Sequence, residues 1–318
     1  MVFAETIPYP EKWVDCLSNL IYSSETNIES THIEYGKYLG LLVKDFIHKH
    51  KVSPDFISSH GHTVFHQPEK GFTLQIGSGQ AISDLLNLPV VFDFRTLDVQ
   101  LGGQGAPLVP IGDKLLFGDY AACLNFGGIA NISYEREKKR IAFDICPFNM
   151  VLNHYARKLG FEYDDNGSLA LSGRTHFELL KTLNELAYYH QEPPKSLGRE
   201  WVEKFVIPLI DALNLPTADV LRTFADHIVF QLEEVLKGIQ AGRILITGGG
   251  AKNSYIVNQL QAKMDSELVI PQELLVDYKE ALVFAFLGVL RRRNEINCLS
   301  SVTGASRDSS SGAITGSS

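Results

Sequence analysis

The sequence predicts an α/β protein with two domains that flank a cleft. Its 318 residues suit two domains of ordinary size better than one small core. Strand-like apolar runs alternate with segments of helical periodicity, which indicates α/β sheets. This alternation occurs twice, and each half opens with hairpin-like strands, so a duplicated arrangement is expected.

Composition and charge exclude several classes of protein. Hydrophobic residues make up 45% of the chain and charged residues 21%, as in soluble globular proteins. The net charge of -8 gives no basic field for nucleic acid or an anionic membrane, so local geometry must hold any bound phosphate group. The four cysteines form no C-x-x-C pair, and no signal peptide or membrane-spanning run is present. A cytoplasmic protein is expected.

In the first half, the pattern predicts a strand over 2–9 that stops at Pro8 and Pro10. Helices follow over 11–19 and 31–50, and Ile33 belongs to the apolar face of the second. Further strands are expected over 55–66, 72–79 and 89–95, with a helix over 81–88. The Gly- and Pro-rich segment 96–117 is expected to be a functional loop.

In the second half, residues 122–126 and 132–144 read as strands, with EREKKR at 135–140 as a solvated turn. Helices are expected over 147–159, 175–190, 199–213 and 216–240, then a strand over 243–247. Two helices, 255–264 and 280–293, complete this half. The Ser/Gly-rich tail, 304–318, is expected to be mobile.

Two glycine runs predict a phosphate site. Gly248, Gly249 and Gly250 follow a buried strand and precede Asn253 and a helix, where glycines let backbone approach a ligand closely. In LNFGGIANIS, Gly127 and Gly128 join two strands between Asn125 and Asn131. A helix cap and a plain hairpin would explain each run alone, but the pair is more specific. Neither run matches a P-loop or G-x-G-x-x-G, which disfavours a dinucleotide-dependent oxidoreductase.

Several polar side chains are candidates for chemistry, each with a structural alternative. Asp144 ends a strand, where it is either a general base or a helix cap before Pro147. The histidines of SHGHTVFH give only a weak metal pattern, and His60 and Thr63 could instead bind a polyhydroxylated ligand. Arg95 lies between Asp93 and Asp98, in a salt-bridged loop or as a clamp for a ligand carboxylate.

Seven motifs in this order resemble the anhydro-N-acetylmuramic acid kinase family of the sugar kinase and actin superfamily. They are SHGHT, DFRTLDVQLGGQGAPLVP, LNFGGIANIS, FDICPFNM, DNGSLALSG, LITGGGAKN and EALVFAFLG. FDICP is similar to the Bacteroidetes branch of that family. The resemblance implies two actin-like, ribonuclease H-like domains. The first comprises residues 1–119 plus 299–318 and the second residues 120–298.

The resemblance also implies an ATP- and Mg²⁺-dependent enzyme of peptidoglycan recycling. It adds water to 1,6-anhydro-N-acetylmuramic acid and phosphorylates O6, which gives N-acetylmuramic acid 6-phosphate. Asp144 would be the catalytic base. The expected nucleotide-binding residues are Asn125, Gly127, Gly128, Gly248, Gly249, Gly250 and Asn253, and the expected sugar-binding residues are His60, Thr63, Arg95, Gly103, Gln104 and Gly105. The partners are the sugar and ATP, and a homodimer is compatible with the resemblance.

One feature of the family is missing from the sequence. Family members open with a strand, a glycine-containing turn similar to MSGTSLDGID and a second strand, but no G-T-S-x-D-G occurs here. A late-assigned start, a fragment or a natural short form would each explain this. The first domain is therefore expected to be incomplete at its start, and the chain itself to have little or no kinase activity. The alternative function is a non-catalytic form that binds sugar or nucleotide.

Overall fold

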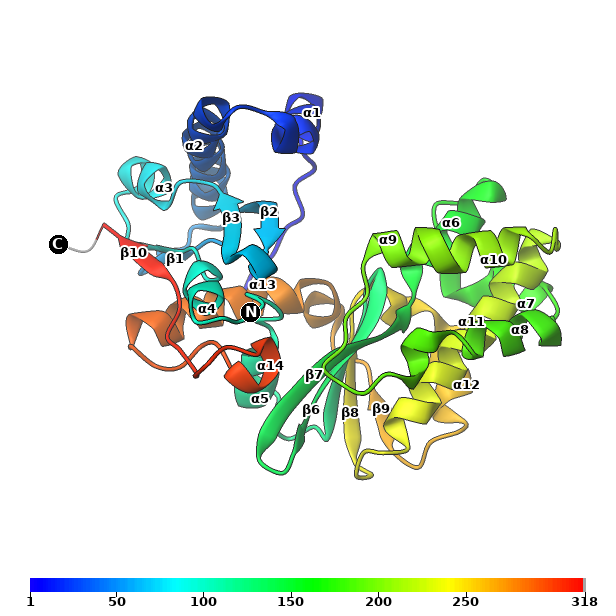
Figure 1. Cartoon of the computed structure of the whole chain (residues 1–318). Coiled ribbons are helices and arrows are strands. Elements are labelled where there is room, and N and C mark those ends of the chain that lie inside the picture. The colour runs from blue at the N-terminus through cyan, green and yellow to red at the C-terminus, as the bar shows by residue number, and fades with distance from the viewer. Residues whose placement is uncertain (317–318) are drawn as a thin grey trace. The chain divides into compact units, whose positions relative to one another are not determined.

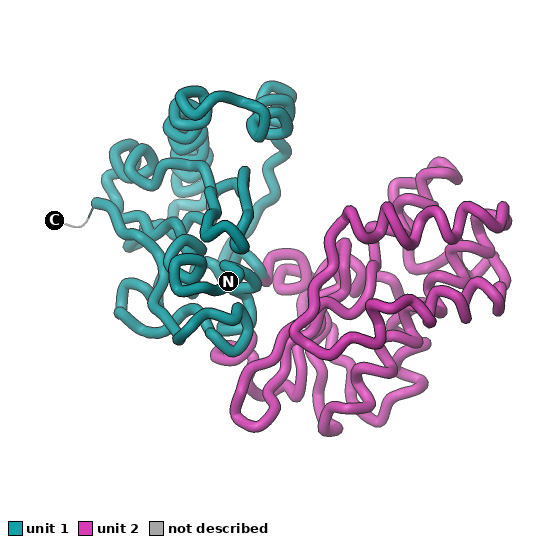
Figure 2. Tube along the Cα trace, in the orientation of Figure 1, with its two compact units in different colours: residues 1–112, 280–318 teal, residues 113–279 magenta. Residues whose placement is uncertain are grey.

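The computed structural model describes residues 1–316, which fold into two compact units (Figure 2). Unit 1 comprises Met1–Gly112 and Glu280–Ser318, and unit 2 comprises Asp113–Lys279. The chain passes between them within two helices, α5 (Pro110–Leu116) and α13 (Glu273–Arg292). The sequence-based domains began and ended elsewhere, since they assigned 113–119 to the first domain and 280–298 to the second.

Unit 1 contains a small mixed sheet and a separate hairpin. Strand β4 (Val90–Phe92) lies between β1 (Ile57–Ser58), which is parallel to it, and β10 (Ala313–Thr315), which is antiparallel. Strands β2 (His62–Gln67) and β3 (Phe72–Ile76) form the hairpin. The α-helices wholly within this unit are α1 (Glu11–Asn19), α2 (Glu25–His50), α3 (Gly79–Leu86), α4 (Thr96–Gln100) and α14 (Ser300–Thr303).

Some predictions for unit 1 are wrong. Residues 1–10 form no strand. Ile33 is 44% exposed, because α2 packs its small residues Gly36 and Gly40 toward α3 instead. The segment 96–117 is not all loop, since it contains both α4 and α5. The tail is ordered through Thr315, because β10 pairs with β4; residues 317–318 lie outside the described part of the chain.

Unit 2 is built on a five-stranded sheet (Figure 1). Its strands are β5 (Ala122–Phe126), β6 (Ile129–Arg136), β7 (Lys139–Pro147), β8 (Arg243–Thr247) and β9 (Glu267–Val269), in the order β7-β6-β5-β8-β9. The first three form an antiparallel meander, and β8 and β9 continue the sheet in parallel. This ribonuclease H-like topology confirms the predicted fold class, including the turn expected within EREKKR.

Helices share one hydrophobic core with this sheet. They are α6 (Asn149–Lys158), α7 (Ser168–Ser172), α8 (Phe177–Asn184), α9 (Arg199–Trp201), α10 (Ile207–Asp211), α11 (Thr217–Leu236) and α12 (Ser254–Gln261). A π-helical turn, Val202–Val206, joins α9 to α10. Leu124, Ile132 and Phe224 belong to the core between sheet and helices. The predicted helix over 175–190 is shorter, because α8 ends at Asn184.

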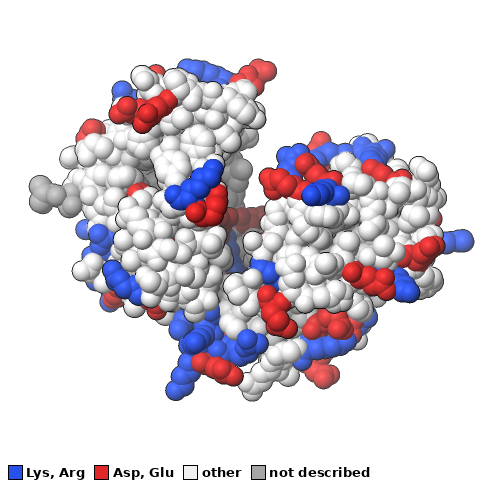
Figure 3. Space-filling model, in the orientation of Figure 1, with Lys and Arg blue, Asp and Glu red and all other residues white. Residues whose placement is uncertain are grey.

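Charged side chains are distributed over both units. On the face shown in Figure 3, acidic and basic residues occur together on each unit, and wide areas carry neither. Within residues 1–316, no helix is long and apolar enough to cross a membrane.

Candidate active site

The two glycine runs lie against each other in unit 2. A Cβ on Gly250 would lie 2.5 Å from Cε1 of Phe148 and 2.8 Å from Cβ of Phe126, so only glycine fits there. Gly248 has a φ of +83°, and a Cβ on it would lie 2.6 Å from Oδ1 of Asn125. The turn that follows β8 therefore packs directly on the end of β5, where the other glycine run begins.

Three other glycines are not required by packing. A Cβ on Gly249 would meet no atom within 4 Å, and one on Gly128 would lie 3.8 Å from Met150. A Cβ on Gly127 would lie 3.4 Å from Nδ2 of Asn125, an ordinary contact. None of the three has a positive φ. Open space lies in front of the backbone of these three glycines, so the fold would accept alanine at each position.

The hairpin turn is fixed to the start of α6. The carbonyl of Gly128 accepts hydrogen bonds from the amides of Phe148 and Met150, at 2.8 and 3.1 Å. The carbonyl of Gly127 accepts from the amide of Asn149, whose Nδ2 donates to the Phe126 carbonyl at 3.3 Å. Asn149 therefore braces the hairpin.

A cavity of about 350 Å³ opens beside the glycine turn, entirely within unit 2. One wall is formed by Gly249, Gly250, Lys252 and Asn253, and the other by the turn 163–166. The remaining lining residues come from α6: Asn149, Leu152 and Asn153. Asn253 is also the N-cap of α12, since its Oδ1 accepts from the amide of Ile256 at 3.2 Å. The volume is at the lower end for small-molecule sites.

A row of polar residues crosses the sheet just before these turns. Asn125 on β5 pairs with Asn131 on β6, which pairs with Asp144 on β7, and Asn125 also pairs with Thr247 on β8. Directly paired residues point to the same face of a sheet. The neighbouring row, Leu124 and Ile132, belongs to the apolar core. The sheet thus presents its polar row on the face away from the core.

Asp144 is held by a segment that the sequence reasoning missed. Its Oδ2 accepts from the amide of Leu197 at 2.8 Å, and its own amide donates to the Lys195 carbonyl at 3.2 Å. The Tyr188 hydroxyl donates to the Asp144 carbonyl at 2.5 Å. Among the described residues, Oδ1 has no hydrogen-bond partner. A signal was available in EPPKSLG, whose two prolines and glycine are typical of a fixed turn.

The surroundings of Asp144 favour its protonated form. Burial raises the pKa of this carboxyl, and the Leu197 amide lowers it by a smaller amount. The carboxylate is not used as a helix cap, and its role as a general base stays a prediction. The helix-cap alternative is wrong, since the N-cap of α6 is Phe148.

In unit 1, the structure brings three of the predicted sugar-binding residues together. The Arg95 guanidinium donates from Nε to Nε2 of His60 at 3.0 Å and from Nη1 to the Gly105 carbonyl at 2.6 Å. Because Nε2 of His60 accepts, its Nδ1 carries the proton and donates to the Gly61 carbonyl at 3.0 Å. Thr63 lies apart from this group in its contacts, in β2 opposite Gln75.

Asp98 organises the loop that contains Gly103, Gln104 and Gly105. Its side chain is fully buried and accepts from the Gly105 amide at 2.7 Å, from the Thr303 hydroxyl at 2.7 Å and from the Cys298 thiol at 3.0 Å. Asp93 instead accepts from the Thr96 hydroxyl. Neither carboxylate pairs with Arg95, so the salt-bridged loop is wrong. In the described residues, no group of three or more His, Cys, Asp or Glu side chains could hold a metal ion.

The protonation of His60 should be visible in the stability of the protein. Burial lowers the pKa of His60 to about 4, and the charge of Arg95 lowers it as well. The unfolded chain binds a proton near pH 6.5 and the folded chain only near 4, so stability falls as the pH falls between these values. We expect His60→Gln to lose stability less steeply in this window, measured by urea unfolding. His48→Gln, at an exposed position of α2, is the control. Parallel curves for wild type and His60→Gln would contradict the assignment.

A family model and the curated relatives that match this chain carry the same description. The family model described as "Anhydro-N-acetylmuramic acid kinase" matches residues 1–317. A kinase of that name from Coxiella burnetii (strain Dugway 5J108-111) is 33% identical, and the match covers 96% of this chain and 88% of the relative. The Shewanella loihica kinase is 34% identical, with 99% and 90% covered. The Shewanella oneidensis kinase is 36% identical, with 86% and 79% covered. The non-catalytic alternative is therefore not favoured.

Similarity to solved structures is weaker. An activator of 2-hydroxyisocaproyl-CoA dehydratase from Clostridium difficile, with bound ADPNP, is 15% identical at a TM-score of 0.38, with 70% of this chain and 88% of that chain covered. A ROK family glucokinase from Streptomyces griseus is 12% identical at a TM-score of 0.31, with 72% and 77% covered. These values carry no argument about function. The absence of a first phosphate hairpin is not tested by any comparison and stays a prediction.

Proposed function

The chain belongs to the anhydro-N-acetylmuramic acid kinase family, and from this we propose that it converts 1,6-anhydro-N-acetylmuramic acid to N-acetylmuramic acid 6-phosphate. Water adds to C1 of the sugar, the bond from C1 to O6 breaks, and O6 takes the γ-phosphoryl group of ATP. The products are the phosphorylated sugar and ADP, and the proton lost by water passes first to a base. This role belongs to peptidoglycan recycling.

We propose that unit 2 binds ATP. The observation that carries this proposal is the contact between the two glycine runs beside a cavity within one unit. Gly127, Gly128 and Gly249 leave backbone exposed in front of open space, as phosphate oxygens require. The cavity of about 350 Å³ suits the nucleoside part of ATP better than the whole molecule. Asn253 would contact this part, while Asn125 braces the turn.

We propose that Asp144 is the base that accepts the proton from water. Oδ2 is already held by the Leu197 amide, so Oδ1 is the oxygen that would take the proton. Fixing one oxygen orients the other, which lowers the cost of placing a base against its water. The raised pKa of Asp144 also makes it a stronger base than an exposed aspartate.

We propose that unit 1 recognises the sugar. The Arg95 guanidinium has five N–H donors, and its bonds to His60 and Gly105 leave some of them for the lactyl carboxylate. These bonds also fix the plane of the guanidinium, which favours a bidentate contact. The Gln104 side chain and Thr63 would add hydrogen bonds to sugar hydroxyls or the acetamido group.

Magnesium is part of the proposal as the partner of ATP. Mg²⁺ usually retains several waters and binds through one or two carboxylates plus substrate phosphates. A site of that kind fits a chain whose described residues form no cluster of three protein ligands. When bound, Mg²⁺ would neutralise charge on the phosphates during transfer.

We also propose a cytoplasmic location and a homodimer, the second testable by light scattering.

The reaction can be tested with the purified chain. ADP release would be coupled to NADH oxidation with ATP, Mg²⁺ and the anhydro sugar, and the sugar product identified by mass spectrometry. We expect ADP release to require both substrates and the product to gain one water and one phosphoryl group. The same assay measures the low turnover expected from the sequence. ATP binding without any phosphorylated sugar would contradict the kinase proposal and support the non-catalytic alternative.

A further inference from the structure

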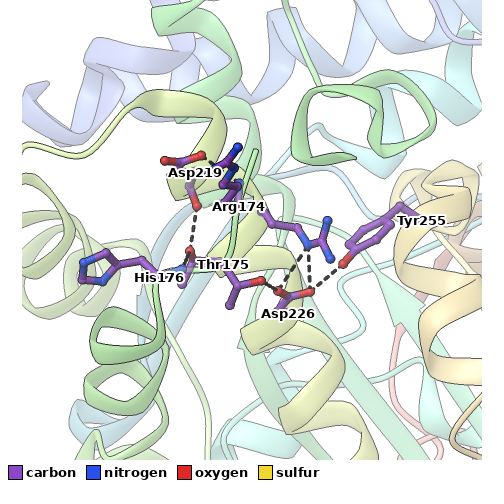
Figure 4. Close-up of polar contacts among 8 residues, drawn as sticks. Arg174, Thr175, His176, Asp219, Asp226 and Tyr255 are labelled. Carbon is purple, nitrogen blue, oxygen red and sulfur yellow. Dashed lines mark hydrogen bonds and ion pairs between the residues drawn. The ribbon is translucent and has the colours of Figure 1, made fainter. Parts of the chain in front are cut away.

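A short segment of unit 2 is bonded along one face of α11. The amide of Arg174 donates to Oδ1 of Asp219 at 2.7 Å, and the amide of His176 donates to Thr223 Oγ1 at 2.9 Å. Between them, the Thr175 hydroxyl donates to Oδ2 of Asp226 at 2.5 Å (Figure 4). The three acceptors are four and three residues apart, so they share one face of the helix. The segment 174–176 is therefore held in register on α11.

Asp226 also bonds to a second part of the unit. The hydroxyl of Tyr255, in the first turn of α12, donates to Oδ1 of Asp226 at 2.6 Å (Figure 4). Arg222, one turn earlier on α11, donates to the same carboxylate at 3.3 Å, and its guanidinium lies 4.9 Å from the centre of the Tyr255 ring. One carboxylate thus joins a loop, α11 and the start of α12.

These two partners lead to opposite walls of the cavity beside the glycine turn. Tyr255 follows Asn253 by two residues, and Asn253 belongs to the first wall. Thr175 follows α7, in which the amides of Leu169 and Ala170 donate to the carboxylate of Asp164 at 2.7 and 3.1 Å. Asp164 belongs to the second wall. Asp226 is therefore a common acceptor for two groups, each connected through a short stretch of chain to one wall.

The walls also contact each other directly on the Tyr255 side. A Cβ on Gly167 would lie 2.4 Å from Cβ of Tyr255 and 2.6 Å from Oδ1 of Asn253. The Ser254 hydroxyl donates to the carbonyl of Asn166 at 3.1 Å. Because Cβ of Tyr255 lies so close to Gly167, a shift of the start of α12 would move the turn 163–167 as well. The position of the start of α12, to which the Tyr255 side chain belongs, is thus coupled to the width of the cavity.

From this arrangement we propose that Asp226 is a positioning residue for nucleotide binding. By accepting from both Tyr255 and Thr175, it sets the separation of the two cavity walls and hence the affinity for ATP. The inference rests on the proposed binding of ATP in unit 2. It assigns no contact between Asp226 and the nucleotide. Arg222, which donates to the same carboxylate, balances its charge.

The test compares two tyrosines that make the same kind of bond. Tyr255→Phe removes the bond to Asp226, and Tyr155→Phe removes a bond of 3.1 Å from a buried tyrosine to Asp211 in the same unit. We expect both variants to lose similar stability in thermal unfolding. Only Tyr255→Phe should weaken the binding of ATP. We expect its Kd, measured by calorimetry with Mg²⁺ present, to rise about fivefold, the size implied by the loss of one hydrogen bond. The Kd of the anhydro sugar should stay within about twofold, below the effect of one such bond.

A second variant keeps the result interpretable. Thr175→Val removes the other bond to Asp226, and we expect it to weaken ATP as well. The double variant should fall short of the sum of the two effects, because both act through one carboxylate. An unchanged ATP affinity in Tyr255→Phe, or an equal loss for ATP and sugar, would overturn the inference while leaving the proposed function intact. No ATP binding by the wild-type chain would contradict both.

Discussion

Replacing Asp144 by asparagine is expected to lower kcat by about 10²- to 10⁴-fold, the range typical for loss of a general base. Asparagine retains the shape of the side chain and can still accept the Leu197 amide, which now bonds to Oδ2 at 2.8 Å. It cannot take a proton from water at C1. The loss should therefore appear in kcat, measured as ADP release at saturating sugar and ATP. The Kd of ATP should change little, because Asp144 does not line the cavity.

The same variant should be more stable than wild type at neutral pH. Burial raises the pKa of Asp144 above its ordinary 3.8, so the folded chain holds this proton more tightly than the unfolded chain. The stability from the protonated form is present below 3.8 and is lost as the pH rises through the folded pKa. We expect the Tm of Asp144→Asn to exceed that of wild type above this window, and the difference to close in acid.

Asp211→Asn provides the opposite control. Its pKa is lowered by the hydrogen bond from Lys158, so this carboxylate favours folding when ionised. The substitution should lower Tm slightly at neutral pH and leave kcat unchanged. If Asp144→Asn retained wild-type turnover, Asp144 would not be the base. If Asp144→Asn had both a lower kcat and a lower Tm, misfolding would explain the lost turnover. The result would then give the catalytic assignment no support.

The sequence was most informative where function depends on local pattern. Gly127, Gly128 and the run from Gly248 to Gly250 could be recognised because each interrupts a strand-like apolar run within a few residues. The strand ending near Asp144 was predictable for the same reason, and the structure places it beside Asn131. Their roles as binding and catalytic residues stay proposals.

The parts that sequence reasoning missed depend on long-range contacts. Asp226 accepts hydrogen bonds from Thr175, 51 residues away in the sequence, and from Tyr255, 29 residues away. No local sequence pattern predicts such contacts. The serine-rich tail was expected to be mobile from composition alone. Its order comes from bonds far along the chain, such as Ser311 Oγ to the Phe94 carbonyl at 2.7 Å. Segment 96–117 contains the short helices α4 and α5 among its glycines and prolines, and α4 is fixed by bonds from Cys298 and Thr303 to Asp98.

Gly250→Ala should damage both the fold and ATP binding. The new Cβ would lie 2.5 Å from the Phe148 ring and 2.8 Å from Cβ of Phe126. Both aromatic side chains are fully buried and stacked at 4.8 Å, so neither can move aside freely. We expect a loss of about 1–3 kcal/mol in the free energy of unfolding, the usual cost of overpacking a core. Urea denaturation measures this loss. Because the strain pushes the glycine turn away from the hairpin, ATP affinity should fall as well.

Gly249→Ala separates the two causes of that loss. Its Cβ would meet no atom within 4 Å, so the free energy of unfolding should change by less than about 0.5 kcal/mol, as for an ordinary surface substitution. If phosphate oxygens approach this backbone, the methyl group will still weaken ATP, and Gly128→Ala should do the same from the hairpin side. Unchanged ATP affinity in both stable variants would mean that the open space in front of these glycines is not where the phosphates lie. Weakened ATP without lost stability would instead show that the two runs act together on one ligand, because only their exposed backbone, and not their packing, would have been altered.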